Sequence, residues 1–199
     1  QRICAVDLGL TNSAVCSVID ANGTVLARKF IRHAREKDQL RRATNYLRKA
    51  QRQTGYASMP RYWNRINGLQ KQILQDTAAQ IIKFAKQHDV HTIVFEFLGK
   101  IRVPKGTYGA KKLRFKLHHW TKIGIQNKVE EMAHYEGMRI SRINPRNTSK
   151  LAYDGSGEVQ RSKRGDLATF QNGKQYHADL SASYNIGARY FIKKKKKTM

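Results

Sequence analysis

Three acidic residues stand where a carboxylate could take part in chemistry: Asp7, Glu96 and Asp179. Asp7 ends the short apolar run RICAVDL, two residues before a glycine. Glu96 lies within the apolar segment HTIVFEF, where burying a carboxylate is costly unless a cation compensates its charge. Asp179 stands at the start of the last segment with helical spacing. Converging carboxylates would repel one another, and a hard cation such as Mg²⁺ or Mn²⁺ would relieve that repulsion.

Such a constellation is typical of phosphodiester hydrolysis. Two divalent ions held about 3.5–4 Å apart by carboxylates can activate water and stabilise the leaving oxygen. Taken singly, two of the acids also have ordinary structural explanations. Asp7 could accept a bond from a turn amide, and Asp179 could cap a helix N-terminus. The prediction of a nuclease site therefore depends on elements that bring the three acids together.

The hydrophobic pattern predicts those elements. Apolar runs predict strands over 2–8, 13–19, 24–31, 91–97 and 138–143, with a hairpin turn at Asn22-Gly23. Helical spacing begins at about residue 34, is interrupted at 55–60, and recurs over 63–82, 117–135 and 178–192. Residues 99–112 predict a flexible loop. A strand that follows a helix indicates a parallel crossover, so the ends of the first and fourth strands should meet at one sheet edge.

This order predicts an α/β protein with the RNase H-like (RuvC) fold, a mixed sheet flanked by helices with a long basic helical insertion. The expected organisation is a core over 1–145, a small loop-rich insert over 146–177, and a helix with a basic tail over 178–199.

Charge is the strongest bulk signal. Lys and Arg number 39 against 14 Asp and Glu, a net charge of +25. A soluble domain typically needs a net charge of only about 2–8, so we expect a nucleic-acid partner rather than a solubilising surface alone. The basic residues are spread along the chain, and no apolar run approaches the ~20 residues of a membrane span, so no membrane partner is expected. The candidate phosphate contacts are Arg35, Arg41, Arg42, Arg48, Arg52, Arg146, Arg161 and Arg164.

Several motifs, in order, resemble one known family. AVDLGLTNSAV, IVFEF and HADLSASYNIGAR resemble the three RuvC motifs of the TnpB and type V CRISPR effector families, and KIGIQNKVEEMAHYEGMRISRINPRNTSK resembles the stretch before their nuclease-associated insert. The resemblance implies that Asp7, Glu96 and Asp179 are catalytic acids that use Mg²⁺ or Mn²⁺, and that Asn185 is structural. It implies an RNA-guided DNA endonuclease, with guide RNA supplying sequence specificity by pairing.

The resemblance also implies a setting. The partners would be guide RNA, target DNA and the remainder of a longer parent protein, whose recognition and wedge domains would precede Gln1. The expected location is the cytoplasm of a prokaryote, in association with the nucleoid.

One departure from the family pattern concerns zinc. TnpB proteins usually carry two CxxC pairs in the insert, whereas here the insert holds no cysteine and a single histidine, His177. No zinc is therefore expected, because a tetrahedral Cys-type site cannot form in this insert.

Three other functions fit parts of the pattern. A nuclease-inactive, RNA-guided DNA-binding protein could retain the acids. An ATPase of the actin and heat-shock class shares the VDLGLTNSAV pattern, but it needs two lobes and a second glycine-rich phosphate motif. A Holliday-junction resolvase or RNase H acting alone shares the core, although the basic helical insertion and the NPRNTSK stretch argue against it.

Overall fold

The structure is a computed structural model that describes residues 1–99, 106 and 108–198. Most of the loop expected at 99–112 lies outside the described residues. The elements are β1 Ile3–Asp7, β2 Ala14–Ile19, β3 Val25–Ile31, α1 Ala34–Thr54, α2 Pro60–Gln87, β4 Thr92–Glu96, α3 Gly109–Tyr135, β5 Arg139–Ile143, β6 Gln160–Arg161, β7 Leu167–Thr169, β8 Gln175–His177 and α4 Ala178–Thr198.

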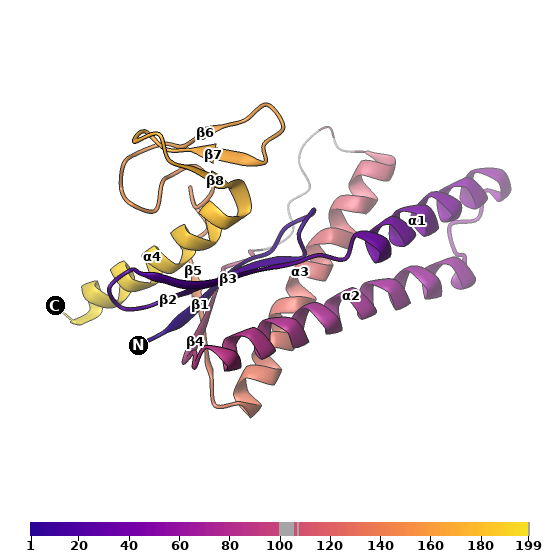
Figure 1. Cartoon of the computed structure of the whole chain (residues 1–199). Helices are drawn as coiled ribbons and strands as arrows, with labels where there is room; N and C mark the ends of the chain where they lie inside the picture. The colour runs from indigo at the N-terminus through magenta and orange to yellow at the C-terminus, as the bar shows by residue number, and fades with distance from the viewer. Residues whose placement is uncertain (100–105, 107, 199) are drawn as a thin grey trace.

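Five strands form the central sheet in the order β3-β2-β1-β4-β5. β1 pairs antiparallel with β2 and parallel with β4, and β5 continues the parallel half beside β4. Helices cover this mixed sheet (Figure 1), so the predicted RNase H-like fold class is confirmed. The parallel pairing of β1 with β4 brings their carboxyl ends to the same edge, as the strand order predicts.

The sheet is buried on both faces, and for this reason its strands are nearly continuous apolar runs. Cys4 and Val6 of β1 pack with residues of α2 and α3 on one face. Ile3 and Ala5, which alternate with them, pack with residues of α4 on the other face. The period of two along the strand thus sorts the core into two layers.

Helix α4 lies very close to the sheet. A Cβ built on Gly187 would stand 2.4 Å from Ile19 Cδ1 and 3.4 Å from Ala5 Cβ. Glycine at this position lets the helix backbone approach β1 and β2, and this approach helps to hold the first turn of α4 over the sheet edge.

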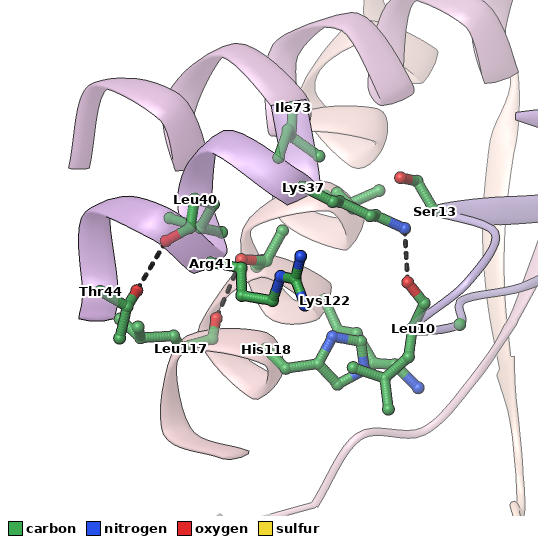
Figure 2. Close-up of a pocket in the computed structure, with 13 residues that line it drawn as sticks. Leu10, Ser13, Lys37, Leu40, Arg41, Thr44, Ile73, Leu117, His118 and Lys122 are labelled. Carbon is green, nitrogen blue, oxygen red and sulfur yellow. Dashed lines mark hydrogen bonds between the residues drawn. The ribbon is translucent and has the colours of Figure 1, made fainter. Parts of the chain in front are cut away.

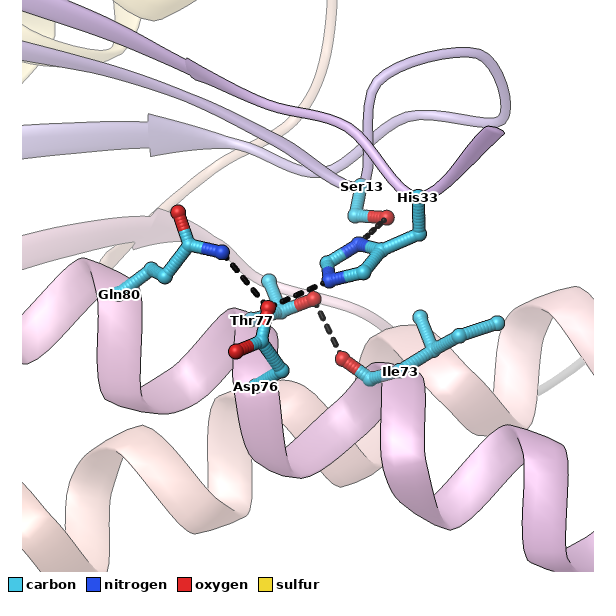
Figure 3. A network of polar contacts seen from close by, with 6 residues as sticks. All are labelled: Ser13, His33, Ile73, Asp76, Thr77 and Gln80. Atoms are coloured by element: carbon cyan, nitrogen blue, oxygen red, sulfur yellow. Dashed lines mark hydrogen bonds and ion pairs between the residues drawn. The ribbon is translucent and has the colours of Figure 1, made fainter. Parts of the chain in front are cut away.

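Helices α1 and α2 form an extended hairpin that projects from the core alongside α3 (Figure 1). Leu47 of α1, Ile66 of α2 and Leu117 of α3 are buried together in a separate apolar cluster. At the base of this hairpin the ring of His33 joins Ser13 Oγ at 2.9 Å to Asp76 Oδ2 at 2.7 Å (Figure 3). The Ser13 hydroxyl is buried, so this network ties β2 to α2 and does not resemble an accessible hydrolase triad.

Three expectations from the sequence differ from the structure. The loop-rich insert contains a small sheet in the order β6-β7-β8, packed through Ala168 and Phe170. Its strands have only two or three residues, too few to show periodicity. Helix α3 starts at Gly109 rather than at residue 117. Its first turns are rich in lysine and arginine, but Leu113 packs against the same apolar cluster as Leu117. The basic tail is helical as far as Thr198.

Candidate active site

The three candidate acids lie at one end of the central sheet. Asp7 and Glu96 are the last residues of β1 and β4, which are parallel neighbours with Val6 opposite Phe95. Alternation along each strand places both acids on the face that α4 covers. Asp179 is the second residue of α4. The two strands and the helix therefore place the three acids on one face of the sheet, at the carboxyl ends of β1 and β4.

The negative charges of Glu96 and Asp179 both act on the carboxyl group of Asp7. The pKa of Asp7 rises from 3.8 to about 7, first because of burial and then because of the nearby negative charge of Glu96 and Asp179. Lys122 and Arg161 oppose this shift. Without a metal ion nearby, the Asp7 carboxyl therefore keeps its proton up to a pH of about 7. The edge therefore has the excess negative charge that would attract a metal ion.

Asp179 is held by a buried amide. Asn12 Nδ2 donates to Asp179 Oδ2 at 2.7 Å, and Arg32 Nε donates to Asn12 Oδ1 at 2.9 Å. Asn12 is fully buried, in the loop between β1 and β2. Gly9 lets this loop approach, since a Cβ there would stand 2.9 Å from Asn12 O and 3.6 Å from Asp179 Oδ2. Asp179 thus lies against the loop that follows Asp7.

Glu96 is held from the segment after β5. The Thr148 hydroxyl donates to Glu96 Oε1, and Gln126 Nε2 donates to the Glu96 carbonyl at 2.9 Å. Asn185 of α4 fixes this segment, because its amide donates to Thr148 O at 3.1 Å and to Leu151 O at 2.7 Å. These contacts agree with the structural role that the resemblance implies for Asn185.

The donor set suits a hard cation. Carboxylate oxygens are the ligands that Mg²⁺ and Mn²⁺ prefer, and Asp7 gains from a positive neighbour. Within the described part of the chain, no group of three His, Cys, Asp or Glu side chains is close enough to form a ready-made metal site. Glu96 and Asp179 each share an oxygen with a hydrogen-bond donor, Thr148 and Asn12 respectively.

The candidate phosphate contacts fall into two groups. Those at 35–52 lie on α1, where Arg41 and Arg42 both pair with Asp38 at 2.7 and 2.8 Å. The second group follows β5. Arg161 lies close enough to lower the pKa of Asp7, and its guanidinium donates to Ser149 O. All eight arginines are exposed except Arg48, which is half-buried.

Sequence reasoning missed the groups that hold the acids. Asn12 is an asparagine next to an apolar run, and Thr148 lies within the INPRNTSK stretch. A polar residue next to a buried strand is the one signal that could have marked Asn12. Lys122 gave no such signal, because a lysine on a basic helix is ordinarily exposed.

Comparison with known proteins begins with sequence. No family model matches the chain. Over 150 residues it is 32% identical to a TnpB-like protein of Aquifex aeolicus (strain VF5), an alignment that covers 70% of this chain and 48% of the relative. The chain therefore spans about half the length of this curated relative.

Solved structures share the fold. A Cas12f1 in complex with sgRNA and target DNA matches with a TM-score of 0.64 and 17% identity, over 93% of this chain and 49% of that chain. T. thermophilus RuvC in complex with a Holliday junction matches with a TM-score of 0.53 and 8% identity, over 98% of this chain and 96% of that chain.

None of the helices within the described residues is long and apolar enough to cross a membrane. Together, the sequence relative and the structural neighbours identify the chain as a TnpB/type V RuvC-like protein.

Proposed function

We propose that the chain is the metal-dependent RuvC nuclease domain of an RNA-guided DNA-targeting protein, and that it hydrolyses DNA phosphodiesters. The observation that carries the proposal is the arrangement of Asp7, Glu96 and Asp179 at one sheet edge, where burial and then the other two carboxylates raise the pKa of Asp7. The neighbours indicate a RuvC-like nuclease of RNA-guided systems in general. The proposal goes beyond this in two respects. The substrate is DNA, and Asp7, Glu96 and Asp179 are the catalytic residues.

The three acids would hold Mg²⁺ or Mn²⁺ through their carboxylate oxygens. Divalent cations at such sites activate water and neutralise charge on the phosphodiester. Hydrogen bonds within the chain hold two of the acids in place. Thr148 donates to Glu96, and Asn12 donates to Asp179. Arg161 is close enough to the acids to attract a phosphate to them and to offset their negative charge. We further propose that no zinc is required.

The partners of the proposal follow from charge and from the neighbours. A net charge of +25 favours a polyanion, and the solved Cas12f1 complex contains sgRNA and target DNA. We propose guide RNA, target DNA and further domains of a longer protein as partners, and the cytoplasm as the location. Exposed arginines of α1, on the projecting hairpin, would contact phosphates of a guide–target duplex.

The test is cleavage of single-stranded DNA in Mn²⁺ by the full-length protein with its RNA, compared with its Asp7→Asn form. We expect cleavage by the unmodified protein and a loss of at least about a thousandfold in the variant, since metal-site chemistry supplies several kcal/mol. Glu158→Gln, at an exposed acid in the insert, is the matched control and should cleave normally. Equal cutting by the Asp7→Asn form would refute the assignment.

The same assay separates the alternative of an inactive DNA-binding protein. That alternative predicts guide-dependent DNA binding with no cleavage at any Mn²⁺ concentration, and equal binding by the Asp7→Asn form.

A further inference from the structure

A cavity lies beside the candidate active site, between the loop after β1 and helices α1, α2 and α3. Its volume is about 210 Å³. Gly9, Leu10 and Ser13 line it from the sheet edge, and side chains from the three helices complete it (Figure 2). This volume is smaller than the roughly 300–1,000 Å³ of pockets for drug-sized ligands, so the cavity suits one ring system rather than a longer segment.

The cavity combines an apolar interior with cationic groups. Its apolar side chains are Leu10, Leu40, Ile73, Leu117 and Ile125. Its cationic side chains are Lys37, Arg41 and Lys122 (Figure 2). An apolar slot with surrounding positive charge is complementary to a nucleotide, whose base is flat and largely apolar on its faces and whose phosphate is an anion.

Two features connect the cavity to the acids. Lys37 Nζ donates to Leu10 O at 2.6 Å, and its charge interacts with Asp179. Lys122 lies close enough to lower the pKa of Asp7. A strand whose backbone reaches the acids would therefore also lie beside the cavity.

The entrance carries an unusual side chain. Leu10 is 70% exposed, although it lies beside the acids in a chain dominated by basic surface. His118 lines the cavity from α3 (Figure 2). Burial and the nearby Lys122 and Lys37 lower the pKa of His118 to about 4, so its ring is neutral at pH 7 and can both accept and donate a hydrogen bond.

We propose that this cavity is a nucleobase pocket, which receives one base of the single-stranded DNA whose backbone reaches the neighbouring acids. The proposal rests on the proposed nuclease function and adds a contact to the base beside those to the phosphates. Apolar contacts from Leu10 and Leu117 would hold the faces of the base, and His118 would bond its edge.

The test measures binding without cleavage, in EDTA, by fluorescence anisotropy. The two probes are a labelled hexathymidylate and an abasic deoxyribose-phosphate chain of the same length. Both carry the same phosphates, so their electrostatic attraction to the chain is equal. We expect the thymidylate to bind about fivefold more tightly, in keeping with the known value of a base contact. Equal affinity for the two probes would overturn the proposal.

A cavity-filling variant has a matched control in the same helix. Thr44 lines the cavity, and its hydroxyl donates to the carbonyl four residues earlier, at 2.8 Å. Thr54 is exposed and makes the same bond at 2.9 Å. Thr44→Met should abolish the preference for thymidylate and leave binding of the abasic chain within twofold. Thr54→Met should behave like the unmodified chain.

Folding is monitored by thermal unfolding. If Thr44→Met does not fold, Leu10→Ala replaces it, because Leu10 is exposed and its loss should reduce the preference without affecting the core. A folded variant that keeps the full preference would contradict the proposal. Because the readout needs no metal, a negative result here leaves the nuclease assignment standing, and a failure of cleavage leaves this binding result standing.

Discussion

Replacing Asp7 by asparagine should stabilise the metal-free chain at alkaline pH. The pKa of Asp7 lies near 7 in the folded chain, against an ordinary 3.8. Because the folded chain holds this proton more tightly than the unfolded chain, protonation of Asp7 stabilises the fold. This stabilisation is fully present below the unfolded pKa of about 3.8 and is lost as pH rises through the folded pKa of about 7. Three pKa units at 1.36 kcal/mol each give an upper bound of about 4 kcal/mol. Because Asp7 is only partly buried, we expect Asp7→Asn to gain about 2–4 kcal/mol at pH 8.

The assay is urea unfolding in EDTA at pH 5 and pH 8. Because the loss for the unmodified chain accumulates at about 1.4 kcal/mol per pH unit, the advantage of Asp7→Asn at pH 5 should be less than half of that at pH 8. Glu158→Gln, at an exposed acid, should change stability by less than about 0.5 kcal/mol at both values. A destabilised Asp7→Asn at pH 8, or a gain independent of pH, would refute the electrostatic reasoning.

Adding a divalent cation should make the unmodified chain more stable than Asp7→Asn. A metal ion that binds only the folded state stabilises it, so Mg²⁺ should raise the stability of the unmodified chain and not that of Asp7→Asn. The proton competes for the same carboxyl. Cleavage at low Mg²⁺ should therefore increase with pH through about 7, and more Mg²⁺ should move the midpoint to lower pH. A midpoint insensitive to Mg²⁺ would show that Asp7 is not a ligand.

Two further substitutions test the groups that position the site. Asn12→Ala frees the carboxylate of the acid in α4 and should weaken apparent Mn²⁺ affinity by about tenfold to a hundredfold, measured from the metal dependence of cleavage. Asn172→Ala removes a similar bond to an aspartate in the insert, at 3.0 Å, and should leave that affinity unchanged. Gly187→Ala should destabilise the chain by about 1–3 kcal/mol in urea unfolding, because its Cβ would meet Ile19. Gly68→Ala has open space around it in α2 and should stabilise by about 0.5–1 kcal/mol.

Much of the core could be predicted from local pattern. The predicted runs RICAVDL and HTIVFEF contain β1 and β4 with one extra residue at each end, because strands buried on both faces are nearly continuous apolar runs. Asn22-Gly23 marks the turn between β2 and β3, and Gly23 adopts the left-handed conformation with φ of 85°. The edge that gathers the acids followed from the crossover rule rather than from any one residue.

The contacts that hold the site could not be predicted in this way. Asn12 and Asp179 are 167 residues apart, and Thr148 and Glu96 are 52 apart, so their pairing depends on tertiary packing. The cavity depends on three helices and a loop, none of which forms it alone. The small sheet of the insert is held by contacts around Phe170 rather than by strand length.

The central claim is that Asp7, Glu96 and Asp179 form one metal site. Titration of the chain with Mn²⁺ at pH 8, with free Mn²⁺ followed by electron paramagnetic resonance, tests it directly. We predict about two bound ions for the unmodified chain, by the two-metal mechanism, and the loss of at least one in each of Asp7→Asn, Glu96→Gln and Asp179→Asn. Unchanged Mn²⁺ binding in any of the three variants would contradict the claim.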